Sequence, residues 1–170
     1  MPLIMGEITV KNVIYKGTQV DRIIYNGVEV FRRMLNVFKD GVLDSGSELS
    51  GFSIRGTELF RGTGNAGEDE TLTASSGVSM DMTDYTTLKV RGRYKTYANY
   101  GSCYIRYGVD SAGTSLTSQA NKTADFNLEI DVTEYTGEHT FRVSLSATNK
   151  SSEPTYMSYS NIWIDTITLE

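Results

Sequence analysis

The sequence alternates between apolar and polar residues over most of its length after residue 36, and it shows almost no helical periodicity. Successive side chains of a β-strand point to opposite faces, so each alternating segment predicts a strand with one buried and one solvated face. The alternation is clear in four segments: 88–93, 103–109, 126–132 and 141–147. Weaker alternation predicts three further strands, at 52–56, 70–74 and 78–82.

With the closing segment, this gives about eight strands separated by Gly, Asn, Asp and Ser. Such a count and spacing predict an all-β fold, an antiparallel β-sandwich of the jelly-roll kind. A chain of 170 residues can bury a core without disulfides. The lone cysteine, Cys103, is therefore expected to be a small buried hydrophobic residue.

The closing segment, "NIWIDTITL" at 161–169, breaks the alternation. Ile162 and Ile164 would lie on one face of a regular strand, with Trp163, Ile167 and Leu169 on the other. Either the strand is buried on both faces, against an N-terminal unit or a neighbouring subunit, or a β-bulge resets the pattern. Both alternatives are open at this point.

The N-terminal segment contains two hairpin signals, ten residues apart. Asn26-Gly27 predicts a two-residue turn in which Tyr25 faces Val28 and Ile23 faces Val30. Lys16-Gly17 predicts a second turn, which places on one side Val13, Tyr15, Thr18 and Val20. Val20 and Ile23 have opposite parity, so a bulge or bend is expected at Asp21-Arg22.

Residues 1–35 therefore form a hairpin unit in front of a sandwich at 36–170. Ribbons of two or three short strands are marginally stable alone, so the unit is expected to rest on the sandwich or on another chain. Ile14, Ile24 and Phe31 would remain on its second face, and an apolar second face usually marks a partner. We therefore interpret the unit as a docking element.

A second echo relates residues 80–90 to 130–143. Four pairs of residues lie fifty positions apart: Asp81 and Asp131, Thr83 and Thr133, Asp84 and Glu134, Tyr85 and Tyr135. Asp and Thr side chains satisfy turns, so the echo predicts two similar corners in which a strand ends and a tyrosine packs over the turn.

The segments "MDMTDYTTLKV", "IDVTEYTGEHTFRVSL" and "SNIWIDTITLE" resemble the jelly-roll sandwich of carbohydrate-binding modules. The segments "LNVFKDGVLDSGSELSGFS" and "VIYKGTQVDRIIYNGVEVF" resemble structural proteins of tailed bacteriophages. Together, the resemblances imply a virion structural protein of the tail tip, baseplate or capsid-decoration type. Its hairpins would dock to other virion proteins, and its jelly roll would project outward and contact the host surface. A homo-oligomer, with a trimer as the commonest form, is implied as well.

The alternative hypothesis is a carbohydrate-binding module that recognises a cell-surface polysaccharide. One feature departs from that family: the single tryptophan, Trp163, lies in a strand that is expected to be packed.

Charge and composition exclude several classes. The chain has a net charge of −5, and all of its excess acid lies beyond residue 36, so nucleic acid is an unfavourable partner. No apolar run reaches the roughly 18 residues of a membrane span. No signal peptide is recognisable, so we expect synthesis in a host cytoplasm and a final location in the virion. Catalysis is not expected. The sequence around His139 shows no nucleophile and acid that would complete a catalytic triad, and the spacing of the acidic residues does not single out a pair of glycosidase carboxylates.

Two tyrosine-rich segments, expected to be loops, are candidates for glycan or partner contact. "RYKTYANYGSCY" carries Tyr94, Tyr97, Asn99 and Tyr100, and "SSEPTYMSYSN" carries Tyr156, Met157 and Tyr159. Tyrosine suits sugar stacking, protein interfaces and core packing, and all three interpretations are open.

The acidic segment 64–70 is a candidate metal site. Its oxygen ligands would be Asn65, Glu68, Asp69 and Glu70, and the fold resemblance implies a structural calcium. The segment lacks the ligand spacing of a calcium loop, so a solvated acidic loop is the favoured alternative.

Overall fold

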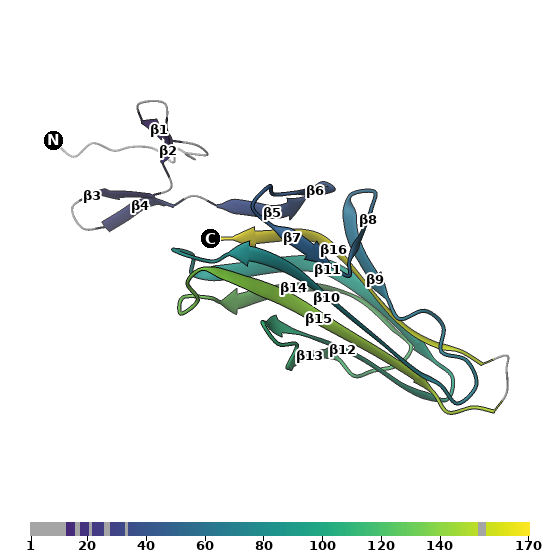
Figure 1. Ribbon diagram of the computed structural model, residues 1–170. Coiled ribbons are helices and arrows are strands. Elements are labelled where there is room, and N and C mark those ends of the chain that lie inside the picture. Colours follow the sequence, from purple (N-terminus) through teal and green to yellow (C-terminus); the bar gives the residue numbers. More distant parts are fainter. Residues whose placement is uncertain (1–12, 16–17, 21, 26–27, 33, 153–155) are drawn as a thin grey trace.

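The computed structural model describes residues 13–15, 18–20, 22–25, 28–32, 34–152 and 156–170, with side chains from residue 34 onward. The described residues form sixteen strands and no helix. Accordingly, no helix among them could cross a membrane. Figure 1 shows the two layers of an antiparallel sandwich, which confirms the predicted fold class.

One layer is a five-stranded sheet. In spatial order its strands are β13 (Thr114–Thr117), β12 (Gly101–Val109), β15 (Glu138–Asn149), β10 (Thr71–Asp81) and β7 (Glu48–Ser50). The other layer has seven strands and is built around β16. Its main path runs through β14 (Lys122–Asp131), β11 (Thr87–Ala98), β16 (Ser158–Leu169), β5 (Leu35–Lys39) and β6 (Val42–Leu43). β9 (Glu58–Gly62) also pairs with β16, and β8 (Ser53–Arg55) pairs with β9.

The core lies between the sheets, on the faces that the alternation predicted. The buried residues of β12 and β15 include Cys103, Ile105, Phe141, Val143 and Leu145. The segments 70–74 and 78–82 join into one strand, β10, because Ser75 to Gly77 continue the same alternation. This burial makes the apolar inner faces the main source of stability.

A β-bulge in β16 explains the irregular closing segment. Arg91 of β11 pairs with Thr166, whereas the next residue, Gly92, pairs with Ile164. Asp165 is therefore an extra residue, and it reverses the parity of everything that follows. As a result the core receives four fully or almost fully buried side chains: Ile162, Ile164, Ile167 and Leu169.

The bulge decides between the two alternatives left open by the sequence. β16 is buried on one face only, so the alternative of burial on both faces is wrong and the bulge is confirmed. Trp163 lies on the outer face, where its ring contacts Phe60. The two-faced pattern of β16 consequently gives no reason to expect a subunit interface. Oligomerisation and a trimer stay predictions.

Gly92 makes the bulge sterically feasible. A Cβ on Gly92 would collide with the carbonyl oxygen of Trp163 and would lie 2.9 Å from the Phe126 ring and 3.0 Å from the Cα of Ile164. Two of these three neighbours are backbone atoms, which cannot rotate away. The bulge therefore depends on the absence of a side chain at this position.

The paired corners are confirmed. Asp81 accepts a hydrogen bond from the backbone N–H of Thr83, and Asp131 accepts one from that of Thr133, both at 2.9 Å. The bonds from the Thr133 hydroxyl and N–H lower the pKa of Asp131. The corners also bond to each other, because the N–H of Gly137 donates to the Thr83 hydroxyl. They close the same end of the sandwich.

The N-terminal hairpins are described for their backbone only. β1 (Val13–Tyr15) pairs with β2 (Thr18–Val20) in the predicted register. In the hairpin of β3 (Arg22–Tyr25) and β4 (Val28–Arg32), Tyr25 faces Val28 as predicted. The predicted pairing of Ile23 with Val30 is wrong: a register shift makes Val30 the extra residue, and Ile23 pairs with Phe31.

The side chains of Ile14, Ile24 and Phe31 lie outside the described part of the chain, as does the expected bend at Asp21. The docking role of these residues and the domain boundary at residue 35 therefore stay predictions.

We expect Gly92→Ala to lower the free energy of unfolding by about 1–3 kcal/mol, the usual cost of overpacking a closed site. Gly113→Ala is the matched control, because a Cβ on Gly113 meets nothing within 4 Å. Urea unfolding of both variants measures the difference. Equal stability of the two variants would contradict the role given to Gly92.

Candidate functional site

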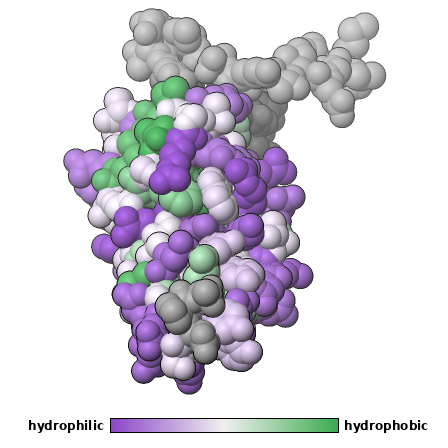
Figure 2. All heavy atoms as spheres, turned by 90° about the vertical axis from the view of Figure 1, so that its right-hand side faces the viewer, coloured by the Kyte–Doolittle hydropathy of each residue, from purple (hydrophilic) through white to green (hydrophobic). Residues whose placement is uncertain are grey.

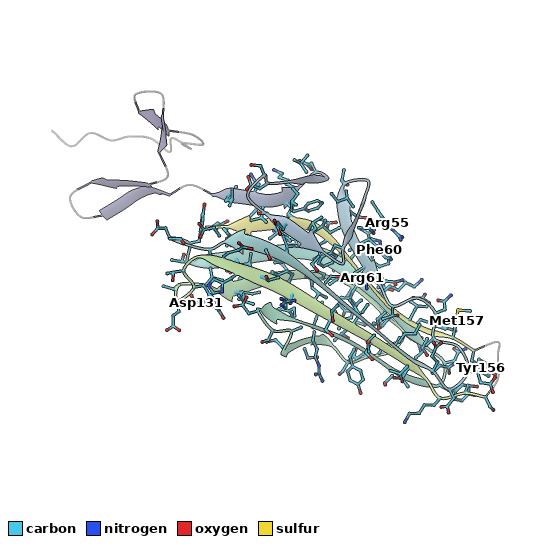
Figure 3. All side chains as sticks on the ribbon, viewed as in Figure 1. Arg55, Phe60, Arg61, Asp131, Tyr156 and Met157 are labelled. Carbon is cyan, nitrogen blue, oxygen red and sulfur yellow. The ribbon has the colours of Figure 1, made fainter. Side chains whose placement is uncertain are left out.

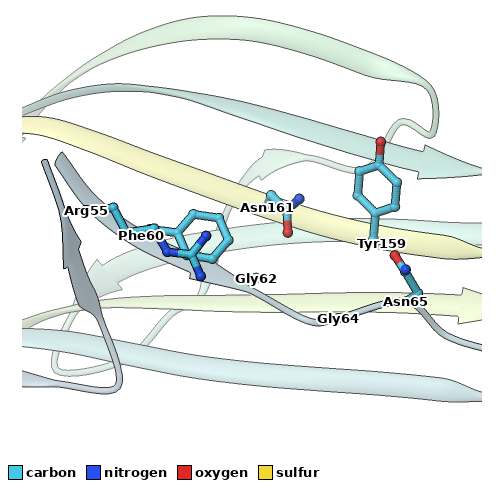
Figure 4. Close-up of a pocket in the computed structure, with 7 residues that line it drawn as sticks. All are labelled: Arg55, Phe60, Gly62, Gly64, Asn65, Tyr159 and Asn161. Atoms are coloured by element: carbon cyan, nitrogen blue, oxygen red, sulfur yellow. The ribbon is translucent and has the colours of Figure 1, made fainter.

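A pocket of about 410 Å³ lies on the outer face of the seven-stranded sheet. It lies over β9 and β16, as Figure 4 shows. Its described lining residues are Arg55, Phe60, Gly62, Gly64, Asn65, Tyr159 and Asn161. None of these is acidic.

Strand register places the outward side chains around the pocket. Trp163, Asn161 and Tyr159 alternate along β16, and at about 3.3 Å per residue this row is about 13 Å long. Trp163 is paired with Phe60 of β9, and Asn161 with Gly62. On the other side, the partners of the β16 row in β11 are Arg93, Lys95 and Tyr97. The result is a grid with aromatic rings at both ends and polar groups in the middle.

The hollow comes from glycine. Gly62 and Gly64 line the pocket between Phe60 and Tyr159, and neither glycine has a side chain to fill the space. A Cβ on Gly62 would collide with the Asn161 amide oxygen and would lie 3.0 Å from the Phe60 ring. The β9 edge of the grid is therefore a depression with a ring at each end.

The rings are held in pairs. Phe60 and Trp163 have centroids 5.3 Å apart, and Tyr97 and Tyr159 stack with centroids 5.6 Å apart and planes 20° apart. The Tyr97 hydroxyl donates a 2.6 Å hydrogen bond to Asn99 Oδ1. Such offset pairs restrict ring movement, so the two ends of the pocket present fixed aromatic surfaces.

Arg93 is neutralised by two carboxylates. Its guanidinium lies 5.0 Å from the Trp163 ring centroid, donates two hydrogen bonds to Glu58 and approaches Asp165 at 4.0 Å. The bonds from Arg93 lower the pKa of Glu58. Partial burial, followed by the neighbouring Glu58 carboxylate, raises the pKa of Asp165. These carboxylates therefore position Arg93, and neither of them lines the pocket.

Three polar groups of the lining have no hydrogen-bond partner among the described residues. The amides of Asn161 and Asn65 and the guanidinium of Arg55 make no hydrogen bond to any described residue. Amides and guanidinium groups supply several donors and acceptors in fixed directions. The pocket thus offers rings for apolar contact and free polar groups for hydrogen bonding.

The structure brings together only some of the predicted contact residues. Tyr97, Asn99 and Tyr159 form one cluster beside the pocket. Tyr100 packs edge-on against Tyr156 with centroids 5.0 Å apart. Figure 3 places Tyr156 and Met157 at the far end of the sandwich, and Arg55 and Phe60 nearer its middle.

The prediction that Tyr94 is a contact residue is wrong. Its side chain is 7% exposed and packs in the core. The segment is not a loop, because β11 extends to Ala98. In a strand, residues three apart point to opposite faces, so Tyr94 turns inward where Tyr97 turns outward.

The sequence interpretation missed Arg55, Phe60, Asn161 and the outward position of Trp163. Phe60 lies in a short strand with no clear alternation, and Trp163 was concealed by the bulge. An available signal was Gly62-Thr63-Gly64, which begins two residues after Phe60, since glycine in a strand often marks a close approach of other groups.

The acidic segment closes on itself. Glu70 accepts a 2.7 Å hydrogen bond from the N–H of Gly67, and Asn65 lines the pocket. Among the residues that the structure describes, no group of three or more His, Cys, Asp and Glu side chains is arranged to hold a metal. Calcium binding by Asn65, Glu68, Asp69 and Glu70 stays a prediction.

His139 and Cys103 have structural roles. His139 bonds to Asp110 through Nδ1 at 2.8 Å and to the carbonyl of Thr136 through Nε2 at 3.2 Å. Cys103 is fully buried, and burial raises the pKa of its thiol, as expected for a small hydrophobic residue. Neither residue belongs to the pocket lining.

Large exposed apolar side chains lie outside the pocket lining. Figure 2 shows a mostly hydrophilic face with hydrophobic residues gathered toward its upper end. Val42 of β6 and Ile54 of β8 are 68% and 46% exposed. The outward residues of β11 and β16 around the pocket are instead aromatic or polar.

No family model matches the chain, and no curated protein matches it. Solved carbohydrate-binding modules are similar in structure. A family 61 module, TmCBM61 in complex with β-1,4-galactotriose, shares 13% identity at a TM-score of 0.41, over 80% of this chain and 98% of that chain. A family 29 module, CBM29-2, shares 13% identity at a TM-score of 0.39, over 80% and 83%.

A third similar structure is the CBM36-1 domain of a multidomain xylanase from the hindgut metagenome of Trinervitermes trinervoides. It shares 9% identity at a TM-score of 0.32, over 66% of this chain and 96% of that chain. Similarities this distant do not establish a family or a ligand for this chain.

The His139–Asp110 pair makes stability depend on pH. The hydrogen bond with Asp110 raises the pKa of His139 above its usual 6.5. The Thr140 N–H, followed by His139, lowers the pKa of Asp110 below its usual 3.8. The stabilisation is therefore complete between pH 3.8 and 6.5, is lost as pH rises through the folded-state pKa of His139, and is lost as pH falls through that of Asp110.

We expect wild type to exceed His139→Gln in stability at about pH 5, and the difference to shrink by about pH 8.5. Urea unfolding at both pH values measures it, with Glu138→Gln as an exposed neighbouring control. A difference that is the same at both pH values would refute the assigned role.

Proposed function

We propose that the protein is a non-catalytic carbohydrate-binding domain and that the pocket between Phe60 and Tyr159 is its binding site. The carrying observation is the combination of fixed aromatic rings at both ends of the pocket with an unpartnered amide, Asn161, between them. Sugar rings have apolar C–H faces that pack on aromatic rings, and hydroxyl groups that bond to amides.

The shape of the site fits an extended chain. The row from Trp163 to Tyr159 follows one strand, and each of its three outward side chains is partly exposed. A polysaccharide lying along β16 would contact the rings at the two ends of the row and the amide of Asn161 in the middle. Because these groups form a linear row, the site favours an internal segment of a glycan chain over a single terminal sugar.

The site lacks the equipment of a glycoside hydrolase. Such enzymes place two carboxyl groups on opposite sides of the scissile bond. The described lining of the pocket contains no carboxylate, and Glu58 and Asp165 on the same face both contact Arg93. Binding without turnover is the function that these groups support.

The virion hypothesis is a separate matter. It depends on sequence resemblance and on the N-terminal hairpins, whose side chains are outside the described residues. A glycan-binding sandwich is compatible with a particle that attaches to a host surface. The virion location, the docking partners and the oligomer stay predictions.

We expect Tyr159→Ala to weaken glycan binding about tenfold or more, which corresponds to about 1.4 kcal/mol. Trp163→Ala is expected to act in the same direction, because it removes the support of Phe60. Tyr104→Ala is the matched control: its ring is 39% exposed on the outer face of the other sheet.

A glycan array identifies ligands of the wild type, titration calorimetry gives the affinities of the three variants, and thermal unfolding verifies that they fold. Wild-type protein that binds no glycan on the array would refute the proposal. Binding that is lost in Tyr104→Ala and kept in Tyr159→Ala would refute the location of the site.

A further inference from the structure

The charges around the pocket are unlike those of the whole chain. The protein has a net charge of −5, yet Arg55 is the single charged residue among the described residues that line the pocket. A second cation, Lys95, stands on β11 next to Asn161. The site is therefore locally positive on an acidic protein.

Arg55 is oriented but not neutralised. Its guanidinium carbon lies 3.6 Å from the centroid of the Phe60 ring. Figure 4 shows the Arg55 side chain beside Phe60. Stacking on a ring occupies the face of a guanidinium and leaves its N–H edge for ligands. Within the described part of the chain, Arg55 makes no ion pair and no hydrogen bond.

Lys95 has a similar environment at the other end of the pocket. Its Nζ lies 5.8 Å from the centroid of the Tyr159 ring. Its cross-strand neighbours are Asn161 and Thr123, both neutral. It too has no ion pair with a described residue. Each ring that flanks the pocket thus lies near a cation that forms no ion pair with a described residue.

Arg93 is a cation on the same face whose charge is satisfied by other residues of the protein. It stacks near Trp163 in a comparable way, but Glu58 and Asp165 satisfy its charge. Cations that only stabilise a fold are commonly paired in this manner. Glu58 is the cross-strand partner of Arg55, but its carboxylate bonds to Arg93. Arg55 and Lys95 thus differ from Arg93 in forming no ion pair with a described acid, and this difference requires an explanation.

We propose that the ligand is an acidic glycan, whose carboxylate or sulfate groups bind Arg55 and Lys95 while its sugar rings pack on Phe60 and Tyr159. The inference rests on the proposed function and specifies its ligand class. Both kinds of acidic group accept bidentate hydrogen bonds from a guanidinium edge. The net negative charge of the remaining surface would oppose diffuse attraction of a polyanion, so binding has to be local.

The test uses a glycan array that carries uronic-acid-containing, sulfated and neutral polysaccharides. We expect the bound glycans to be acidic, and we expect Arg55→Gln and Lys95→Gln each to weaken their binding about tenfold. The class of the bound glycans then distinguishes a carboxylate from a sulfate ligand. Binding is also expected to weaken as the ionic strength rises.

Arg106→Gln is the matched control, because Arg106 also lies over a tyrosine ring, 6.0 Å from the centroid of Tyr104, on the outer face of the other sheet. Equal losses in Arg106→Gln and Arg55→Gln would mean diffuse attraction and would overturn the inference. An exposed residue such as Arg55 is expected to be replaceable without loss of folding, which thermal unfolding verifies.

The two proposals fail in different ways. If the bound glycans are neutral, and Tyr159→Ala abolishes binding while Arg55→Gln does not, the acidic ligand is refuted and the proposed function stands. If no glycan binds, or if Tyr159→Ala binds as well as wild type, the proposed site is wrong and the inference fails with it.

Discussion

The bulge between β11 and β16 is the constraint on which both faces of the seven-stranded sheet depend. Inserting Asp165 opposite the Arg91–Gly92 step reverses the parity of β16. Ile167 and Leu169 then join Ile162 and Ile164 in the core. The same step keeps Trp163 on the outside, and it is sterically feasible because position 92 has no Cβ to meet the backbone of Trp163.

The outer face follows from this register. Since Trp163 is outward, Asn161 and Tyr159 are outward too, and β9 aligns Phe60 and Gly62 with them. The glycines leave a hollow, and the ring pairs on either side keep it open. Core packing and the candidate site are therefore two consequences of one strand arrangement, so a change that shifts the register of β16 affects both.

Electrostatics divide the same surface into a fixed and a free part. Glu58 and Asp165 hold Arg93 against Trp163, which stabilises one end of the grid. Arg55 and Lys95 lie over neighbouring rings and form no ion pair with a described acid. Two of the carboxylates on this face thus lie at one cation, and the described pocket lining contains no carboxylate.

The sequence by itself determined the strands, their inner faces and the paired corners. Alternation depends only on neighbours along the chain, so residues such as Ile105, Val143 and Phe141 could be assigned to the core from local pattern. The Asp81 and Asp131 turns were predictable for the same reason, because their hydrogen bonds are formed within two residues.

Only the tertiary structure decided the site. Trp163 turns outward because of a bulge against a strand some seventy residues earlier, and Phe60, Arg55 and Asn161 meet through pairing between β8, β9 and β16. Tyr94 and Tyr97 lie on opposite faces because pairing with β16 keeps β11 extended through Ala98. Such features arise from cross-strand register, which no local pattern encodes.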